Sequence, residues 1–427
     1  MVVVMQAEQQ ERPKIYIGAC GIGHGHIRRM LYFAREVRNF ARILFSTYGD
    51  GIPPLRREGM RFVECPPIEL EYGGPQIKIE PRLFLAKIPQ KLFRFFLQIL
   101  WEIRHIKMFR PDLVISDTRL STIVAARILG VPSILVADQL HIIIPSRDEK
   151  LLPRWKLLLK RFAEQVIAII MLKLWSLSNK IVIPDLPPPY DLSRDIHKFA
   201  LRYIRRKLAF IGPMLSRRIR LSKVDNKDFL REKYDVSKNK VLVYILISGA
   251  RYERALMIRA IKRLLQSKRS LDDMLEFIIS LGNPKGTLRR RIGKNFQIWS
   301  WIPDNLEVIA ISDVAVIMAG PMTMYEVLFF GKPIIAIPFP QHTQKEANAC
   351  MLEELGVGRV LRIDDFNYDE ISKQALELVK SAPTSKLEKI RKLIELFDGV
   401  EKLTALVRDM LKANVGQESR KVNAGDK

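Results

Sequence analysis

The chain has 427 residues and the composition of a folded protein, with 48% hydrophobic and 27% charged residues. This length suffices for two or three domains, and no apolar run reaches the roughly 18 residues of a membrane-spanning helix. The net charge of +25 favours an anionic partner such as nucleic acid, lipid headgroups or a phosphorylated substrate, although a densely charged surface of the thermophile type would also produce it.

The cysteines and the N-terminus bear on the compartment. Cys20, Cys65 and Cys350 have neither metal-ligand spacing nor an even disulfide count, which favours a reducing compartment. The first five residues are too short an apolar run for a signal peptide, and charged residues follow them. We therefore expect a cytoplasmic protein without a metal site.

Strand-like and helix-like segments alternate in the first half of the chain. The predicted strands of this half are 14–20, 42–46, 112–116 and 133–137, and its predicted helices are about 26–39 and 119–129. Such alternation is typical of βαβ units with a parallel sheet.

A second alternation begins after Ile211-Gly212-Pro213-Met214, which interrupts the pattern and is the candidate hinge. The predicted strands of this half are 240–246, 277–280, 296–299, 313–318 and 333–337. The sequence therefore predicts one α/β domain over 1–214, a second over 215–412, and a polar, aperiodic tail over 413–427 that we expect to be disordered.

Two segments of the first half combine aromatic and basic residues. Residues 82–110 and 150–180 each interleave Phe or Trp with seven Lys or Arg and a single Glu. Basic amphipathic helices with such aromatics suit the surface of an anionic membrane. The alternative is a pair of ordinary packing helices with solvated basic faces.

A glycine-rich loop with two histidines follows the first predicted strand. The stretch Gly21-Ile22-Gly23-His24-Gly25-His26-Ile27-Arg28-Arg29 permits a sharp turn and close approach of a ligand. It lies at the carboxyl end of a strand, where open α/β sheets bind ligands. Its glycine spacing does not match the dinucleotide fingerprint.

The second half contains a strand, a glycine turn and a helix around Gly320. Free backbone N–H groups at the start of this helix, together with the helix dipole, form a site for a diphosphate. Glu326 lies about one turn further on, where a carboxylate can accept hydrogen bonds from ribose hydroxyls. The sequence therefore predicts nucleotide binding by the second domain.

In this order the elements resemble a GT-B glycosyltransferase, over about residues 14–410. Gly23, Gly25, His26 and Arg29 match the G-x-G-H-x-x-R motif of inverting members. The general similarity is to N-acetylglucosaminyltransferases that act on polyprenyl-diphosphate-linked acceptors in cell-wall and N-glycan assembly. The resemblance implies an α/β fold of two Rossmann-like domains that face each other across a cleft.

By this resemblance the histidine of the loop is the general base, a task that a near-neutral pKa suits. His26 fits the longer motif, while His24 fits the shorter Gly21-x-Gly23-His24 and stays a competing candidate. Asp117, at the end of a predicted strand, orients the base or the acceptor, or else caps the next helix. Two loop histidines without a catalytic part remain the structural alternative.

The resemblance also assigns donor contacts. Diphosphate contacts fall to two turns, uracil contacts to the segment after strand 296–299, and the ribose to Glu326. The expected donor-binding residues are Ser248, Gly249, Trp301, Ile302, Gly320, Met322, Thr323, Glu326, His342, Gln344 and Lys345. Each also has a structural alternative as a helix cap, a core side chain or a solvated helix residue.

The motif His-x-[Asp/Glu]-Gln-x-x-Asn-Ala is only partly kept. His342, Asn348 and Ala349 match it, but Gln344 and Lys345 replace its acid and its Gln. These positions usually contact sugar hydroxyls in the family. The departure leaves the identity of the transferred sugar open.

The sequence therefore predicts an inverting glycosyltransferase at the cytoplasmic face of an anionic membrane. We expect it to move a sugar, with N-acetylglucosamine as the first candidate, from a UDP-sugar to a lipid-linked or phosphorylated acceptor. No cofactor is expected, because helix N-terminal N–H groups can stabilise the departing diphosphate. The alternatives are a UDP-sugar 2-epimerase, a diacylglycerol-type glycolipid glycosyltransferase and a basic nucleic-acid-binding protein, which no nucleic-acid motif supports.

Overall fold

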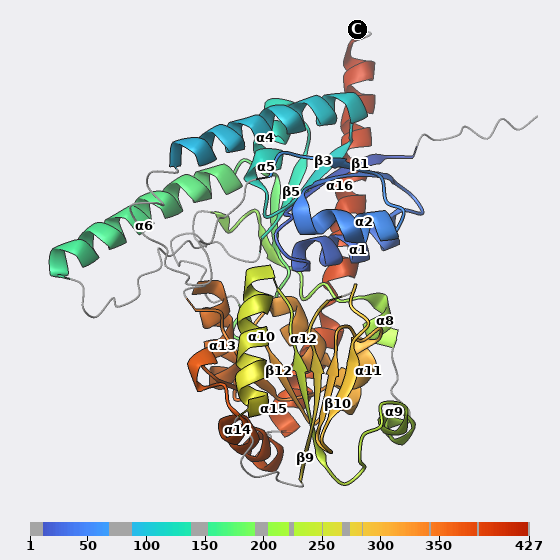
Figure 1. The fold of residues 1–427 in the computed structure, drawn as a ribbon. Helices are drawn as coiled ribbons and strands as arrows, with labels where there is room; N and C mark the ends of the chain where they lie inside the picture. The colour runs from blue at the N-terminus through green and yellow to red at the C-terminus, as the bar shows by residue number, and fades with distance from the viewer. Residues whose placement is uncertain are drawn as a thin grey trace, which may run out of the picture.

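The structure is a computed structural model with two α/β domains, one above the other in Figure 1. It describes residues 12–67, 88–137, 153–192, 204–221, 226–249, 251–266, 274–283, 285–340, 343–381 and 384–425. Each domain is built on a seven-stranded sheet. The expected GT-B arrangement of two Rossmann-like domains is confirmed.

The first sheet is parallel throughout, in the order β3-β2-β1-β4-β5-β6-β7. Its strands are β1 (Lys14–Ala19), β2 (Arg42–Thr47), β3 (Phe62–Glu64), β4 (Leu113–Asp117), β5 (Ser133–Val136), β6 (Lys180–Ile183) and β7 (Leu208–Phe210). Successive side chains of β1 enter the cores on opposite faces, with Ile15 and Ile17 on one and Tyr16 on the other.

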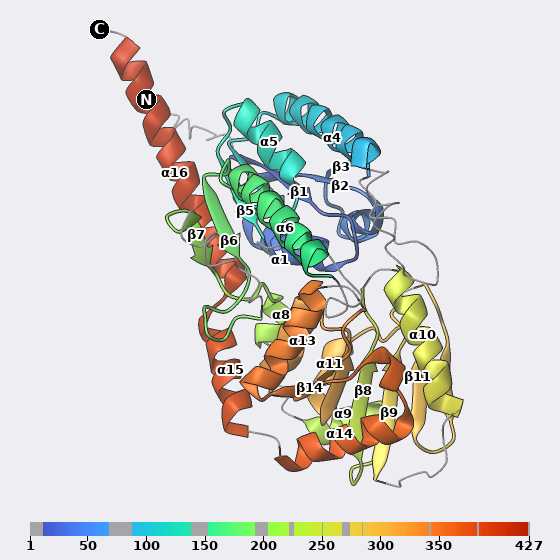
Figure 2. The ribbon, with the colours of Figure 1, turned by 90° about the vertical axis from the view of Figure 1, so that its left-hand side faces the viewer.

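Helices cover both faces of this sheet (Figures 1 and 2). One face carries α4 (Ile88–Phe109), α5 (Leu120–Ile128) and α6 (Arg154–Trp175). The other carries α1 (Gly25–Val37), α2 (Ile52–Arg57, after the short helix η1, Gly49–Gly51) and α16 (Gly399–Gly425). This cover explains why the strands are apolar throughout.

The second sheet has the order β10-β11-β9-β8-β12-β13-β14, with only β10 antiparallel to its neighbour. Its strands are β8 (Val241–Leu246), β9 (Leu275–Ser280), β10 (Arg289–Ile292), β11 (Phe296–Trp299), β12 (Val314–Ile317), β13 (Ile334–Ala336) and β14 (Gly358–Val360). The sequence missed β10, because Arg289, Arg290 and Arg291 leave this edge strand with no apolar pattern.

Helices again lie on both faces. One face carries α10 (Arg251–Gln266), η3 (Ile363–Asp365) and α14 (Tyr368–Ser381). The other carries α8 (Arg217–Leu221), α9 (Lys227–Lys233), α11 (Asn305–Ile311), α12 (Pro321–Phe329), α13 (Thr343–Leu355) and α15 (Thr384–Leu396).

The chain crosses between the domains more often than the sequence predicted. Leu186 and Leu192, after β6, pack in the core of the second domain. Helix α16 returns to the first domain and buries Leu403 and Val407 in its core (Figure 1). The expected single division between 1–214 and 215–412 is therefore corrected. Helix α16 packs on the first domain because its apolar residues, three and four positions apart, form a stripe that needs burial.

The expected disorder of the tail is also corrected. Helix α16 continues to Gly425, so residues 413–425 are helical. Extending a helix adds one hydrogen bond for each residue fixed, and the packed turns before residue 412 supply the costly nucleus. Polar composition alone therefore did not predict the end of this element.

Leu403→Ala tests the return of α16. Leucine to alanine in a filled core costs about 2–5 kcal/mol of unfolding free energy, and Leu403 is fully buried. Leu396→Ala is the matched control, because that leucine is 72% exposed at the end of α15. Urea unfolding should show the loss in the first variant only; equal small losses in both would contradict the packing of α16.

Candidate active site

Both sheets reverse their strand order between two central strands, β1 and β4 in one and β8 and β12 in the other. Ligands of open α/β sheets bind at the carboxyl ends of such strands. The glycine-histidine loop follows β1, Asp117 ends β4, Ser248 and Gly249 follow β8, and Gly320 follows β12. The structure therefore brings the main predicted residues to these two positions.

His26 is held by a buried carboxylate. Its Nδ1 lies 2.9 Å from Asp117 Oδ1. Arg29 Nε donates to Asp117 Oδ2 over 2.6 Å, and Thr118 Oγ1 donates to Oδ1 over 2.8 Å. With Nδ1–H donating to Asp117, the Nε2 of His26 keeps its lone pair, and none of the described residues bonds to it. The ring is 23% exposed, so this nitrogen is accessible to a substrate hydroxyl.

The charges of this cluster shift its proton affinities. Burial lowers the pKa of His26, but the Asp117 carboxylate raises it more through its charge and hydrogen bond, to about 9. Burial raises the pKa of Asp117, but Arg29 and then His26 hold it well below its usual range. Asp117 therefore stays ionised and His26 becomes neutral only in alkaline solution, unless a substrate alters the balance.

His24, the competing histidine, has a different environment. It precedes α1 as its N-cap residue, and burial lowers its pKa. Its Nδ1 is buried without a hydrogen-bond partner among the described residues. The Asp117 carboxylate, which can orient a base, is hydrogen-bonded to His26 and not to His24, so the geometry favours His26.

The turn at Gly320 has the predicted form of a strand, a glycine turn and a helix start. Ala319 has a φ of +47°, Gly320 is the N-cap of α12 and no side chain caps the helix. Pro321 carries no N–H, and those of Met322 and Thr323 have no intrahelical acceptor because they lie in the first turn. Asn348 Nδ2 donates to the carbonyl of Ala319 over 3.2 Å and so secures the turn.

Glu326 is fully buried and contacts the first domain. Arg28 Nη2 donates to Glu326 Oε1 over 2.6 Å. Glu326 Oε2 has no hydrogen-bond partner among the residues that the structure describes. Sequence reasoning missed Arg28, since two adjacent arginines at a helix start do not indicate which of them reaches a residue 298 positions away.

The loop after β8 is tied to the altered motif on α13. Lys345 Nζ lies 2.5 Å from Glu253 Oε1, and both side chains are largely buried. A Cβ at Gly249 would lie 2.0 Å from Glu253 Oε2, and the φ of Gly249 is +97°, so glycine is required there. Lys345 thus has a counter-ion, which the sequence did not predict, while Gln344 is half-buried on the same helix.

The remaining residues predicted to bind the donor differ in how exposed they are. Trp301 is 44% exposed after β11. The side chain of Ile302 is buried in the core, which leaves only its backbone for a ligand. His342 lies outside the described residues. Across the described parts of the chain no group of three His, Cys, Asp or Glu side chains could hold a metal ion.

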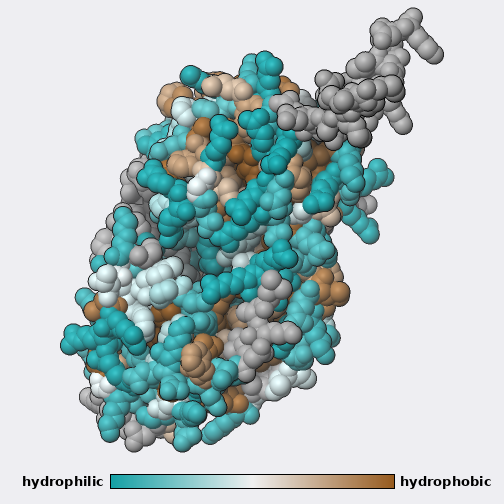
Figure 3. Space-filling view, turned by 90° about the vertical axis from the view of Figure 1, so that its right-hand side faces the viewer, coloured by the Kyte–Doolittle hydropathy of each residue, from teal (hydrophilic) through white to brown (hydrophobic). Residues whose placement is uncertain are grey.

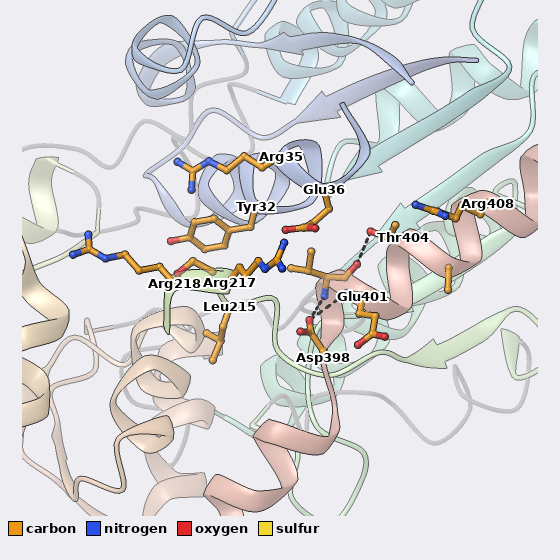
Figure 4. Close-up of a pocket in the computed structure, with 13 residues that line it drawn as sticks. Tyr32, Arg35, Glu36, Leu215, Arg217, Arg218, Asp398, Glu401, Thr404 and Arg408 are labelled. Carbon is orange, nitrogen blue, oxygen red and sulfur yellow. Dashed lines mark hydrogen bonds between the residues drawn. The ribbon is translucent and has the colours of Figure 1, made fainter. Parts of the chain in front are cut away.

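A separate pocket of about 550 Å³ lies where α1, the interdomain linker and the start of α16 meet (Figure 4). Tyr32 and Arg35 of α1 face Arg217 and Arg218 of the linker across it, and Glu401 lies on α16. None of the residues predicted from the sequence lines this pocket. It is a feature of the hinge and not of the catalytic cluster.

Helices α4 and α6 expose apolar stripes on their outer faces. The exposed side chains are Leu92, Phe93, Phe96, Leu97 and Leu100 on α4, and Trp155, Leu158, Leu159, Phe162, Val166, Ile169 and Ile170 on α6. Spacings of three and four place each set on one side of its helix. The face away from α6 is largely hydrophilic (Figure 3). Within the described residues no helix is both long and apolar enough to cross a membrane.

Comparison with known proteins agrees with this geometry. Residues 255–403 match the glycosyltransferase family 28 C-terminal domain. An uncharacterized glycosyltransferase of Methanosarcina mazei is 27% identical, over 95% of this chain and 99% of that protein. The UDP-N-acetylglucosamine–N-acetylmuramyl-(pentapeptide) pyrophosphoryl-undecaprenol N-acetylglucosamine transferase of Desulfitobacterium hafniense is 23% identical, over 92% and 96%. The calicheamicin glycosyltransferase CalG4 has a TM-score of 0.63 at 16% identity, over 94% and 99%.

The fold, the matched region and these relatives identify the protein as a GT-B glycosyltransferase. At low identity it resembles the N-acetylglucosamine transferases that act on pyrophosphoryl-undecaprenol-linked acceptors. The predicted fold class and the prediction of a glycosyltransferase are therefore confirmed.

The pairing of His26 with Asp117 predicts the titration of the ring. By NMR of the imidazole nitrogens, His26 should titrate at about 9 in the wild type. In Asp117→Asn the charge that raises the pKa of His26 most is removed and burial remains the largest influence, so the midpoint should fall below about 6.5. His24 is the internal control and should titrate below its ordinary value in both proteins. An unchanged His26 midpoint in the variant would refute the pairing.

Proposed function

We propose that the protein is an inverting glycosyltransferase that moves a sugar from a UDP-sugar to a lipid-linked acceptor at a membrane surface. The observation that carries this proposal is the ionised Asp117 behind His26, in a first domain whose helix α1 also reaches Glu326 on α12. In this proposal His26 is the base and α12 binds the nucleotide, and the contact between Arg28 and Glu326 joins the two helices that carry them. N-acetylglucosamine is the first candidate for the sugar, by similarity to the relatives described above.

The base acts through its free nitrogen. His26 Nε2 removes the proton from the acceptor hydroxyl, while Asp117 keeps Nδ1 protonated and stabilises the charged ring that results. The hydroxyl oxygen bonds to the anomeric carbon as the bond from that carbon to the diphosphate oxygen breaks. Attack from the side opposite the leaving group inverts the anomeric centre.

The second domain receives the charge of the departing UDP. The N–H groups of Met322 and Thr323, at the start of α12, are oriented before the reaction and so lower the cost of developing charge. The loop at Ser248 and Gly249 supplies further backbone groups at the end of β8. We propose that no metal or other cofactor takes part.

The apolar stripes of α4 and α6 suit an anionic bilayer. Basic residues such as Arg94, Lys156 and Arg161 lie among the exposed Phe, Trp and Leu side chains. Aromatic residues enter the headgroup region while basic ones pair with anionic lipids. We propose that these helices bring the first domain to its lipid-linked acceptor on the cytoplasmic face.

Release of UDP tests the reaction. With a panel of UDP-sugars and a polyprenyl-diphosphate-sugar acceptor, one donor should give acceptor-dependent UDP release. His26→Ala should reduce the rate by about 10²–10⁴-fold, the usual contribution of a general base. The rate should rise with pH, because only the neutral ring accepts a proton.

His24→Ala is the matched comparison for that experiment. Loss of activity in this variant, with His26→Ala active, would transfer the role of base to His24. Conversion of the UDP-sugar to its epimer without an acceptor would indicate a 2-epimerase. No turnover of any donor, together with salt-sensitive binding of nucleic acid, would overturn the proposal.

Sedimentation with vesicles tests the membrane surface. Protein should bind phosphatidylglycerol-containing vesicles more tightly than phosphatidylcholine vesicles. The triple variant Trp155→Ser, Leu158→Ser, Phe162→Ser should bind at least tenfold more weakly, since each large apolar side chain contributes about 1.5–3 kcal/mol when fully buried. Phe229→Ser is the control, because Phe229 is equally exposed but lies on α9 of the second domain. Equal binding by both variants would contradict the assignment.

A further inference from the structure

The two oxygens of the Glu326 carboxylate have different environments. Oε1 accepts the bond from Arg28, whereas Oε2 is buried and no described residue donates to it. A buried carboxylate oxygen without a donor is costly. Its position one turn into α12, beyond the free N–H groups of Met322 and Thr323, points to a ligand hydroxyl as the missing donor.

Arg28 also has N–H groups that make no hydrogen bond to the described residues. Its Nη2 donates to Glu326 Oε1 and, over 2.9 Å, to Tyr32 Oη. A guanidinium has five N–H groups, and those on Nε and Nη1 have no partner among the described residues. The side chain is 36% exposed. Tyr32, which lines the hinge pocket (Figure 4), accepts one of these bonds and so fixes the orientation of Nη2.

The contact between Arg28 and Glu326 lies beside a second set of hydrogen bonds made by α12. The preceding residue, Tyr325, donates from Oη to Asp185 Oδ1 and accepts from the N–H of Leu186 over 3.3 Å. Asp185 and Tyr325 are both buried. Two successive residues of α12 are thus attached to segments outside that helix, Tyr325 to the segment after β6 and Glu326 to α1 of the first domain. These contacts fix where Arg28 meets the carboxylate.

We infer that Arg28 determines donor specificity by binding the ribose diol together with Glu326. This inference rests on the proposed function, which positions a nucleotide at the Gly320 turn. Each of two neighbouring ribose hydroxyls can donate and accept one bond. One hydroxyl donates to Glu326 Oε2, and its neighbour accepts from an unused N–H of Arg28. Both domains therefore bind the ribose, through charge-assisted hydrogen bonds that are stronger than hydrogen bonds between neutral groups.

Calorimetric titration with UDP and with 2′,3′-dideoxy-UDP tests this role. The wild type should bind UDP about 100-fold more tightly, because the deoxy analogue leaves both charged groups without their partners. In Arg28→Met that preference should fall by at least about tenfold. Arg28→Lys keeps a cation beside Glu326 but lacks the planar fork, so it should fold and keep an intermediate preference.

Arg35→Met is the matched control, two helical turns further along α1. Arg35 pairs with Glu58 at the surface and does not contact Glu326, so this variant should keep the wild-type preference. If Arg28→Met binds both ligands more weakly but keeps the ratio of the two affinities, Arg28 is only a counter-ion of Glu326. Tighter binding of UDP by that variant would mean that Arg28 blocks the carboxylate. Either result overturns the inference.

The same titration separates this inference from the proposed function. If the wild type prefers UDP over the dideoxy analogue and both Arg28 variants keep the full preference, the inference fails and the UDP donor stands. If the wild type binds no UDP, the proposed donor fails and the inference fails with it. Should Arg28→Met not fold, the ratio measured for Arg28→Lys against Arg35→Met decides.

Discussion

Two successive buried side chains of helix α12 bind segments outside it: Glu326 binds α1 of the first domain, and Tyr325 binds the segment after β6. The arrangement of the site depends on these two contacts. The bond between Tyr325 and Asp185 is buried, and the Arg28 pair leaves Glu326 fully buried. Loss of either partner group therefore costs more than loss of a surface ion pair. The helix start at Gly320 and His26 come from different domains. Their relation is therefore set by contacts within hydrogen-bond distance, not by the sheets alone.

The chain is strongly basic, yet the buried carboxylates around the site each have a basic partner. Asp117 meets Arg29, Glu326 meets Arg28, and Glu253 meets Lys345. A further pair, Glu102 with Arg119, lies beneath the site at 2.5 Å. These pairs fix the direction of each carboxylate, which is what electrostatic preorganisation requires. The many surface cations remain available for anionic partners.

Much of the fold followed from the sequence, because buried parallel strands are short apolar runs bounded by glycine and proline. The turn at Gly320 and the histidine loop were predicted from local features that a helix start or a glycine imposes. The partners of Glu326 and Lys345 were not, since they depend on contacts between distant segments. The return of α16 was missed for the same reason: its apolar stripe indicates burial but not which domain provides it.

Two of the crossings of the chain between the domains touch each other. Gly399 N donates to the carbonyl of Pro213 over 3.2 Å. Gly212 has a φ of +89°, and a Cβ there would lie 2.2 Å from the carbonyl oxygen of Phe397. The linker at Gly212 and the segment before α16 therefore connect the domains at one place. A relative motion of the domains that keeps these contacts is a rotation about this joint and not a translation.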